Sequence, residues 1–176
     1  MKKMLFLTLA LVLLAVQAQA ISCTSALPAS YLKEILEGVH LKAHTYKIAF
    51  VRTAGSGTYG AATTSYTGIG ADEVPNGGGY TTGGYTIAAN GTPPAPTTGS
   101  VTSPDTYGYM TFTDLSVNGP LQFAEASTCA VIYNDTVAGK PAVAVLSFGS
   151  VFPNQGALTV DFPASGYNTS LISINH

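Results

Sequence analysis

The hydrophobic pattern of the chain is mostly that of short β-strands separated by turn-forming residues. In Thr45–Arg52 the side chains of Tyr46, Ile48 and Phe50 share one face, and the other face is apolar too, which predicts a central strand. Further strands are predicted at Gly84–Ala89, Tyr109–Val117, Thr128–Tyr133, Ala142–Phe148, Ala157–Phe162 and Ser170–Ile174. This spacing predicts an all-β fold, namely an antiparallel β-sandwich, barrel or jelly-roll-like domain.

One segment has the periodicity of a helix instead. Apolar side chains recur on a single helix face in Pro28–Glu37, where Pro28 suits the first turn and Gly38 suits the end. This predicted stripe consists of Leu32, Ile35, Leu36 and Val39. Because so short a helix is marginal by itself, we expect the stripe to dock on the sheet.

The N-terminal residues have the pattern of a secretory signal peptide. Lys2 and Lys3 precede the apolar run Met4–Val16, and the small-residue site Ala18-Gln19-Ala20 follows it. The run has 13 residues, whereas a membrane-spanning helix needs about 20. We therefore predict a signal peptide over residues 1–20 and one exported domain, periplasmic or extracellular, over residues 21–176, with no stable membrane span after cleavage.

Two cysteines follow the predicted cleavage site, and their state is left open by the sequence. In an oxidising compartment Cys23 and Cys129 could form a disulfide across a very long loop. Cys129 could equally be a small buried apolar residue, with Cys23 unpaired. Lipidation of Cys23 is a third reading, disfavoured because Ala20-Ile21-Ser22 lacks the larger aliphatic residue usual before a lipidated cysteine.

The charge and composition of the chain limit the kinds of molecule that it is expected to bind. The whole chain has seven basic residues, of which two lie in the signal peptide, and nine acidic ones, so the exported domain has a net charge of 5 − 9 = −4. Phosphate binding needs clustered lysine and arginine, so nucleic acid is not an expected partner. Residues 53–108 are rich in Gly, Thr, Pro and Tyr and are expected to be mostly loop.

Candidate chemistry is sparse. Gly55-Ser56-Gly57-Thr58-Tyr59-Gly60 matches the pattern of a dinucleotide-binding loop, but no helix is expected after it, so we interpret it as a flexible loop. His40 and His44 could bind a metal ion if a third ligand lay close to them. We expect both histidine side chains to be exposed to solvent instead. No serine lies in a nucleophile elbow and the acidic residues are scattered. We expect no enzyme activity, no cofactor and no metal.

Tyrosines in and beside the Gly-rich region are the best candidates for a functional surface. Aromatic side chains on adaptable loops make good contacts with other proteins. The alternative is that they pack beneath their own loops. The candidate interface residues are Tyr59, Tyr66, Tyr80, Tyr85 and Tyr107.

The order of segments from Ser30 onward resembles small virion structural proteins, of the decoration or tail-associated kind, of tailed bacteriophages. The matching segments are 30–40, 46–50, 63–67, 73–74 leading to 79–84, 130–134, 142–149 (Ala-Val-Ala-Val-Leu-Ser-Phe-Gly) and 158–163 (Leu-Thr-Val-Asp-Phe-Pro). The resemblance implies a β-sandwich that builds or decorates a particle through contacts with other subunits, as a homo-oligomer or with capsid or tail proteins. It implies no catalysis and no cofactor.

The signal peptide is a departure from that family, since virion proteins normally assemble in the cytoplasm. Two functional hypotheses therefore remain. A structural subunit of a virion or virion-like assembly would be oligomeric or particle-bound, with Cys23 and Cys129 reduced. A secreted or periplasmic binding or adhesion module would be cleaved after Ala20 and could contain a disulfide.

Overall fold

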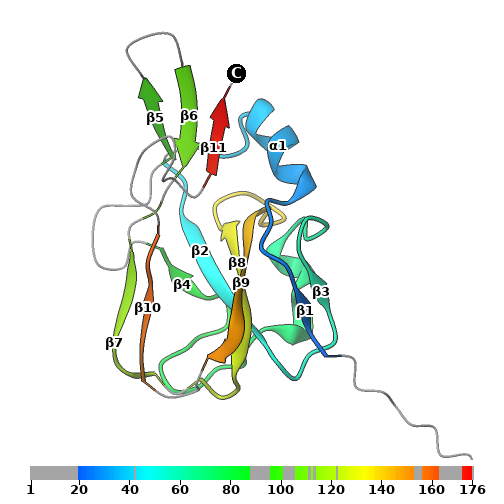
Figure 1. Cartoon of the computed structure of the whole chain (residues 1–176), viewed down its shortest axis with the longest axis vertical. Coiled ribbons are helices and arrows are strands. Elements are labelled where there is room, and N and C mark those ends of the chain that lie inside the picture. The colour runs from blue at the N-terminus through cyan, green and yellow to red at the C-terminus, as the bar shows by residue number, and fades with distance from the viewer. Residues whose placement is uncertain are drawn as a thin grey trace, which may run out of the picture.

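A computed structural model describes residues 20–41, 43–87, 96–100, 106–110, 112, 114–121, 123–152, 156–162 and 172–175 (Figure 1). In this part of the chain the secondary structure is mostly strands in antiparallel sheets, with one short α-helix, which confirms the all-β class. The closure of these sheets into a sandwich or jelly roll stays a prediction. Residues 1–19, which contain most of the predicted signal peptide, lie outside the described residues.

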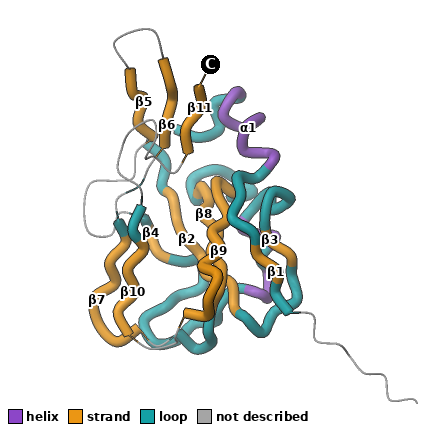
Figure 2. The backbone as a smooth tube through the Cα atoms, viewed as in Figure 1, coloured by secondary structure: helices purple, strands orange, loops and turns teal. Residues whose placement is uncertain are grey.

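A four-stranded antiparallel sheet forms the centre of the described structure (Figures 1 and 2). Its strand order is β4 (Tyr85–Thr86), β2 (Tyr46–Arg52), β8 (Ser127–Asn134) and β9 (Ala142–Phe152). Ile48 of β2 is the register partner of Ile132 in β8, and Val131 of β8 is that of Val145 in β9. β2 thus has a neighbour on each side, as its two apolar faces predict.

Both faces of this sheet are buried, each in its own apolar cluster. Alternate residues of β2 and β8, such as Phe50 and Ile132, pack in the larger cluster with Tyr31 of the helix and Leu158. The intervening residues, such as Val131, pack in the second cluster with Tyr59 and Ile69. Full burial of one such side chain contributes about 1.5–3 kcal/mol to the free energy of unfolding. Strands β2 and β8 are therefore stabilised by apolar contacts on both of their faces.

Three smaller sheets surround the central one. β7 (Leu115–Leu121) pairs with β10 (Gly156–Val160), and β6 (Thr106–Met110) lies between β5 (Pro96–Ser100) and β11 (Ile172–Asn175). β1 (Ser22–Cys23) pairs in parallel with β3 (Thr58–Tyr59).

Two strand predictions need correction. The single strand predicted at Tyr109–Val117 is wrong, because β6 and β7 divide that stretch and belong to different sheets. Asp114 lies between them and accepts a hydrogen bond at 2.7 Å from the Phe162 amide, which ties the start of β7 to the end of β10. The strand predicted at Gly84–Ala89 is only Tyr85–Thr86 in the structure, and Ala88 and Ala89 lie outside the described residues.

Helix α1 (Ala29–Leu36) begins directly after Pro28, as predicted, and Gly38 follows it with φ 70°. Its predicted apolar face is partly wrong. Tyr31 and Ile35 pack on the core, whereas Leu32 and Leu36 are exposed. The aromatic ring of Tyr31 fills the inner position, which leaves the leucine pair on the flank of the helix.

The segment predicted as loop is closely packed in its first part, up to residue 87. It contains β3, β4 and two short 3₁₀ turns, Tyr66–Gly68 and Gly70–Asp72. Gly84 has φ +76°, and a Cβ atom there would overlap the backbone carbonyl of Ile48. Only glycine permits this close approach of the segment to β2.

Candidate functional site

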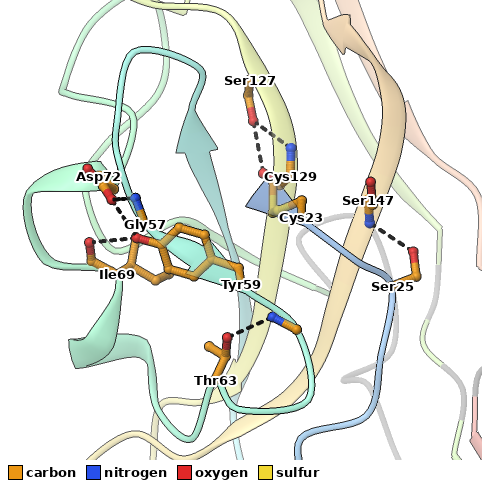
Figure 3. Close-up of a disulfide and its surroundings, with 11 residues drawn as sticks. Cys23, Ser25, Gly57, Tyr59, Thr63, Ile69, Asp72, Ser127, Cys129 and Ser147 are labelled. Carbon is orange, nitrogen blue, oxygen red and sulfur yellow. Dashed lines mark hydrogen bonds between the residues drawn. A yellow bond between two sulfur atoms is a disulfide. The ribbon is translucent and has the colours of Figure 1, made fainter. Parts of the chain in front are cut away.

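The N-terminal segment is fastened to the central sheet by a disulfide between Cys23 of β1 and Cys129 of β8 (Figure 3). The two residues are 106 positions apart, with their Cα atoms 6.1 Å from each other. Cys129 is fully buried, and the Ser127 hydroxyl donates a hydrogen bond to its carbonyl oxygen at 2.9 Å. The bond therefore joins the start of the domain to the middle of its core.

Backbone hydrogen bonds continue this attachment along the segment. The Ser22 amide donates to the Gly57 carbonyl at 3.1 Å, and Ala26 and Val145 exchange both of their hydrogen bonds, at 3.1 and 2.9 Å. The Ser25 hydroxyl accepts from the Ser147 amide at 2.9 Å. Residues 22–26 thus lie against β3 on one side and along part of β9 on the other.

The glycine motif at residues 55–60 binds the protein's own carboxylate. The Ser56 and Gly57 amides donate to the two carboxylate oxygens of Asp72, at 3.3 and 2.8 Å, and the Tyr59 hydroxyl donates at 2.8 Å. The motif contains strand β3 and no α-helix follows it in the described residues, so it offers no helix N-terminus for a pyrophosphate. The loop is not free: a Cβ atom at Gly55 would overlap this carboxylate.

A second carboxylate, that of Glu73, accepts three hydrogen bonds within residues 66–83. Glu73, which is buried, accepts hydrogen bonds from the hydroxyls of Tyr80 at 2.6 Å and Tyr66 at 2.7 Å, and from the Gly83 amide at 2.7 Å. Burial, followed by the hydrogen bond to Glu73, raises the pKa of both tyrosines well above the usual range. Both hydroxyls therefore stay protonated and donate at any physiological pH.

Two of the five predicted interface tyrosines, Tyr59 and Tyr80, are buried beneath the loops that carry them. Tyr59 is 5 % exposed and Tyr80 is 2 % exposed, which fits the alternative that these side chains pack beneath their own loops. The physical reason is that each hydroxyl has an internal acceptor, which makes burial favourable. Tyr66 and Tyr85 are half-buried, and the Tyr85 hydroxyl donates to the Gly79 carbonyl at 2.9 Å. The side chain of Tyr107 lies outside the described residues.

The two histidines also lie differently from the prediction. The His40 side chain is 1 % exposed, not solvent-exposed, and its Nε2 atom lies 2.9 Å from the Glu34 carboxylate of α1. The Asn134 amide nitrogen lies 2.9 Å from His44 Nδ1 and 3.3 Å from His40 Nδ1. This cluster connects the end of α1 to the end of β8. Among the described residues, no group of three or more His, Cys, Asp or Glu could hold a metal ion.

Burial makes the histidine cluster sensitive to acid. Desolvation lowers the pKa of His40 despite the opposing hydrogen bond and charge of Glu34, and His44 lowers it further. Tyr31 and Tyr46, whose rings lie against the imidazole, add no positive charge, and burial raises the pKa of Tyr46 to about 12. The folded protein therefore binds a proton at His40 less readily than the unfolded chain does.

We expect the free energy of unfolding to be largest above pH ~6.5, the pKa of an unfolded histidine, and to fall as the pH drops below it. One group contributes a slope of at most about 1.4 kcal/mol per pH unit. Urea unfolding between pH 8 and 5.5 measures this slope. The slope should be smaller in His40→Gln, and an equal slope in both proteins would contradict the assignment.

The described large apolar residues that remain exposed are four leucines of the N-terminal segment, a feature the sequence pattern did not predict. Leu36, the last residue of α1, is 89 % exposed, and Leu32, one turn earlier, is 53 % exposed. Leu27, just before the helix, and Leu41, after it, are 36 % and 50 % exposed. All four leucines lie between residues 27 and 41 of the chain.

A shallow apolar pocket lies on the same segment. Its volume is about 200 Å³, and its lining comes from the chain before α1 and from β9. The lining residues are Ser25, Ala26, Leu27, Ala144, Val145 and Leu146. Leu27 is both exposed and part of the pocket lining. We call the four exposed leucines and the pocket the N-terminal contact surface.

No protein-family model, no curated protein and no solved structure matches this chain. Within the described residues, no helix is both long and apolar enough to cross a membrane.

Proposed function

We propose that the chain is a non-catalytic structural subunit of a virion or virion-like assembly and acts through protein–protein contacts. The observation that carries this proposal is the N-terminal contact surface, where Leu36 and Leu32 are exposed while most other large apolar side chains of the described residues are buried. Two carboxylates support it as well, since Asp72 and the buried Glu73 accept hydrogen bonds from the protein's own donors. We infer the kind of assembly from the resemblance to phage virion proteins.

The disulfide favours a second candidate, a secreted or periplasmic binding or adhesion module. Disulfides form and persist in oxidising compartments, and Cys23 and Cys129 are paired, whereas a virion subunit was expected to have both cysteines reduced. The signal-peptide pattern at residues 1–20 supports the same setting. Both candidates use the same domain for contact with other proteins, and they differ in where the partner is.

Fractionation of cells that produce the protein at its natural level tests the proposal. The chain should be recovered in complexes larger than a monomer, measured by size-exclusion chromatography with light scattering. Co-purification with phage particles would support the virion subunit, and recovery from the envelope or the medium with Ile21 as the first residue would support the exported module. A monomer that binds no protein in any fraction would contradict both.

A further inference from the structure

We propose that Asn134, the last residue of β8, is a proton-sensitive link between the residues that follow α1 and the central sheet. The link holds while the Nδ1 atoms of His40 and His44 have no proton, and it breaks when they gain one. The Asn134 side chain is buried, and its amide nitrogen faces both of these ring atoms, at 3.3 and 2.9 Å. The link is a property of the domain itself and does not depend on the proposed function.

Two backbone groups fix which way the Asn134 amide points. Its oxygen accepts a hydrogen bond from the Thr136 amide at 3.1 Å, and its nitrogen donates to the Val39 carbonyl at 3.4 Å. The opposite orientation would place the oxygen against that carbonyl and the nitrogen against the Thr136 N–H, so both hydrogen bonds would be lost. The amide nitrogen must therefore be the atom that faces the two histidines.

This orientation determines where each imidazole has its proton. An amide nitrogen only donates, so the two Nδ1 atoms beside it must accept and are unprotonated. The neutral His40 ring then has its proton on Nε2, which lies 2.9 Å from the Glu34 carboxylate and donates to it. A second donor faces the other ring, because His44 Nδ1 lies 3.4 Å from the Leu41 amide nitrogen.

A proton added at Nδ1 makes the contact with Asn134 one of donor against donor. Protonated His40 keeps its hydrogen bond to Glu34, which opposite charge strengthens, and loses the one to Asn134. The other titratable groups beside His40 are the second histidine and the rings of Tyr31 and Tyr46, and burial raises the pKa of both tyrosines, so neither is charged. Acid therefore favours the contact with α1 over the contact with β8.

The expected change is local. Tyr31 and Ile35 hold α1 on the core through apolar contacts that a proton does not affect. The Tyr46 hydroxyl still donates to the Leu41 carbonyl at 3.1 Å. Because desolvation lowers the pKa of His40, the link should open below pH ~6.5, the value of an unfolded histidine. The helix should stay docked while its attachment to the end of β8 is lost.

Long-range ¹H–¹⁵N NMR of the full oxidised chain tests the link, because the shift of each ring nitrogen reports whether it is protonated. At pH 8 we expect Nδ1 to be unprotonated in both His40 and His44. Once His40 is protonated, the side-chain amide of Asn134 should lose at least tenfold of its protection from exchange with water, while the Ile132 backbone amide keeps its own. A proton on either Nδ1 at pH 8, or unchanged protection of Asn134, would overturn the proposal.

Asn134→Asp places an acceptor of nearly the same shape beside the two Nδ1 atoms. The midpoint of the His40 titration should rise by at least one pH unit, a tenfold gain in proton affinity, and neutral His44 should move its proton to Nδ1. Charge alone would raise the midpoint and leave the tautomer unchanged, and that result would contradict the role of the amide donor. Glu34→Gln is the matched control at the other ring nitrogen. It should lower the His40 midpoint and leave Nδ1 unprotonated. If Asn134→Asp does not fold, the wild-type spectra still decide.

Discussion

Reduction of the Cys23–Cys129 disulfide is expected to lower the free energy of unfolding by about 4–5 kcal/mol. The bond closes a loop between residues 106 positions apart, and a cross-link of this span restricts the unfolded chain by roughly that amount. For a domain of this size the midpoint of thermal unfolding should fall by about 10–20 °C. The effect is large because the loop that the bond closes is long, so the bond strongly restricts the unfolded chain.

Chemical unfolding of the oxidised protein and of the reduced, alkylated protein measures this difference. Cys23→Ser and Cys129→Ala should each reproduce most of it, and the double variant should cost little more than either single one, because both changes break the same bond. Additive losses, or unfolding of the reduced protein at the same denaturant concentration, would contradict a structural role for the disulfide.

Replacement of Glu73 by alanine should be the second most damaging change, with a loss of about 3–5 kcal/mol. The carboxylate accepts hydrogen bonds from Tyr80, Tyr66 and Gly83, and Tyr80 is almost fully buried. Without the acceptor, buried donors are left unsatisfied, at a cost of about 1–3 kcal/mol each. Loops 66–84 should then detach from β2, and hydrogen exchange of their amides should increase.

Matched variants separate this cluster from a general effect of charge removal. Tyr80→Phe removes one donor and also the acceptor of the Phe50 amide at 3.1 Å, so it should be damaging too, and less than additive with Glu73→Ala. Glu37→Ala removes a carboxylate from an exposed ion pair and should change stability by less than about 1 kcal/mol. Equal effects of Glu73→Ala and Glu37→Ala would contradict the role assigned to Glu73.

The two central strands could be predicted from the pattern, because both of their faces are apolar. Thr45–Arg52 and Thr128–Tyr133 alternate two apolar sets, and the structure places them at the centre as β2 and β8. The break between β6 and β7 could not be predicted, because β7 starts beside β10, where Asp114 accepts a hydrogen bond from the Phe162 amide, 48 positions away. Such long-range partners leave no periodic signal in the sequence.

Which side chains of the loops and the helix remain exposed was harder to predict, for a related reason. From the sequence, Tyr59 and Tyr80 are aromatic residues of a loop. In the structure their hydroxyls donate hydrogen bonds to Asp72 and Glu73 respectively. The spacing predicts that Leu36 packs on the core, but Tyr31 occupies the inner face of α1 and Leu36 is exposed. In each case the spacing gives the element and its amphipathic character, whereas competition among side chains for the same buried space decides which of them remains exposed.

Native mass spectrometry of the oxidised protein, isolated from the compartment in which it accumulates, tests the central claim of an exported, contact-forming domain most directly. We predict a subunit mass that begins at Ile21 and lacks two hydrogens because of the Cys23–Cys129 bond, in complexes of two or more chains. A free monomer of the full 176 residues with both thiols reduced would contradict that claim.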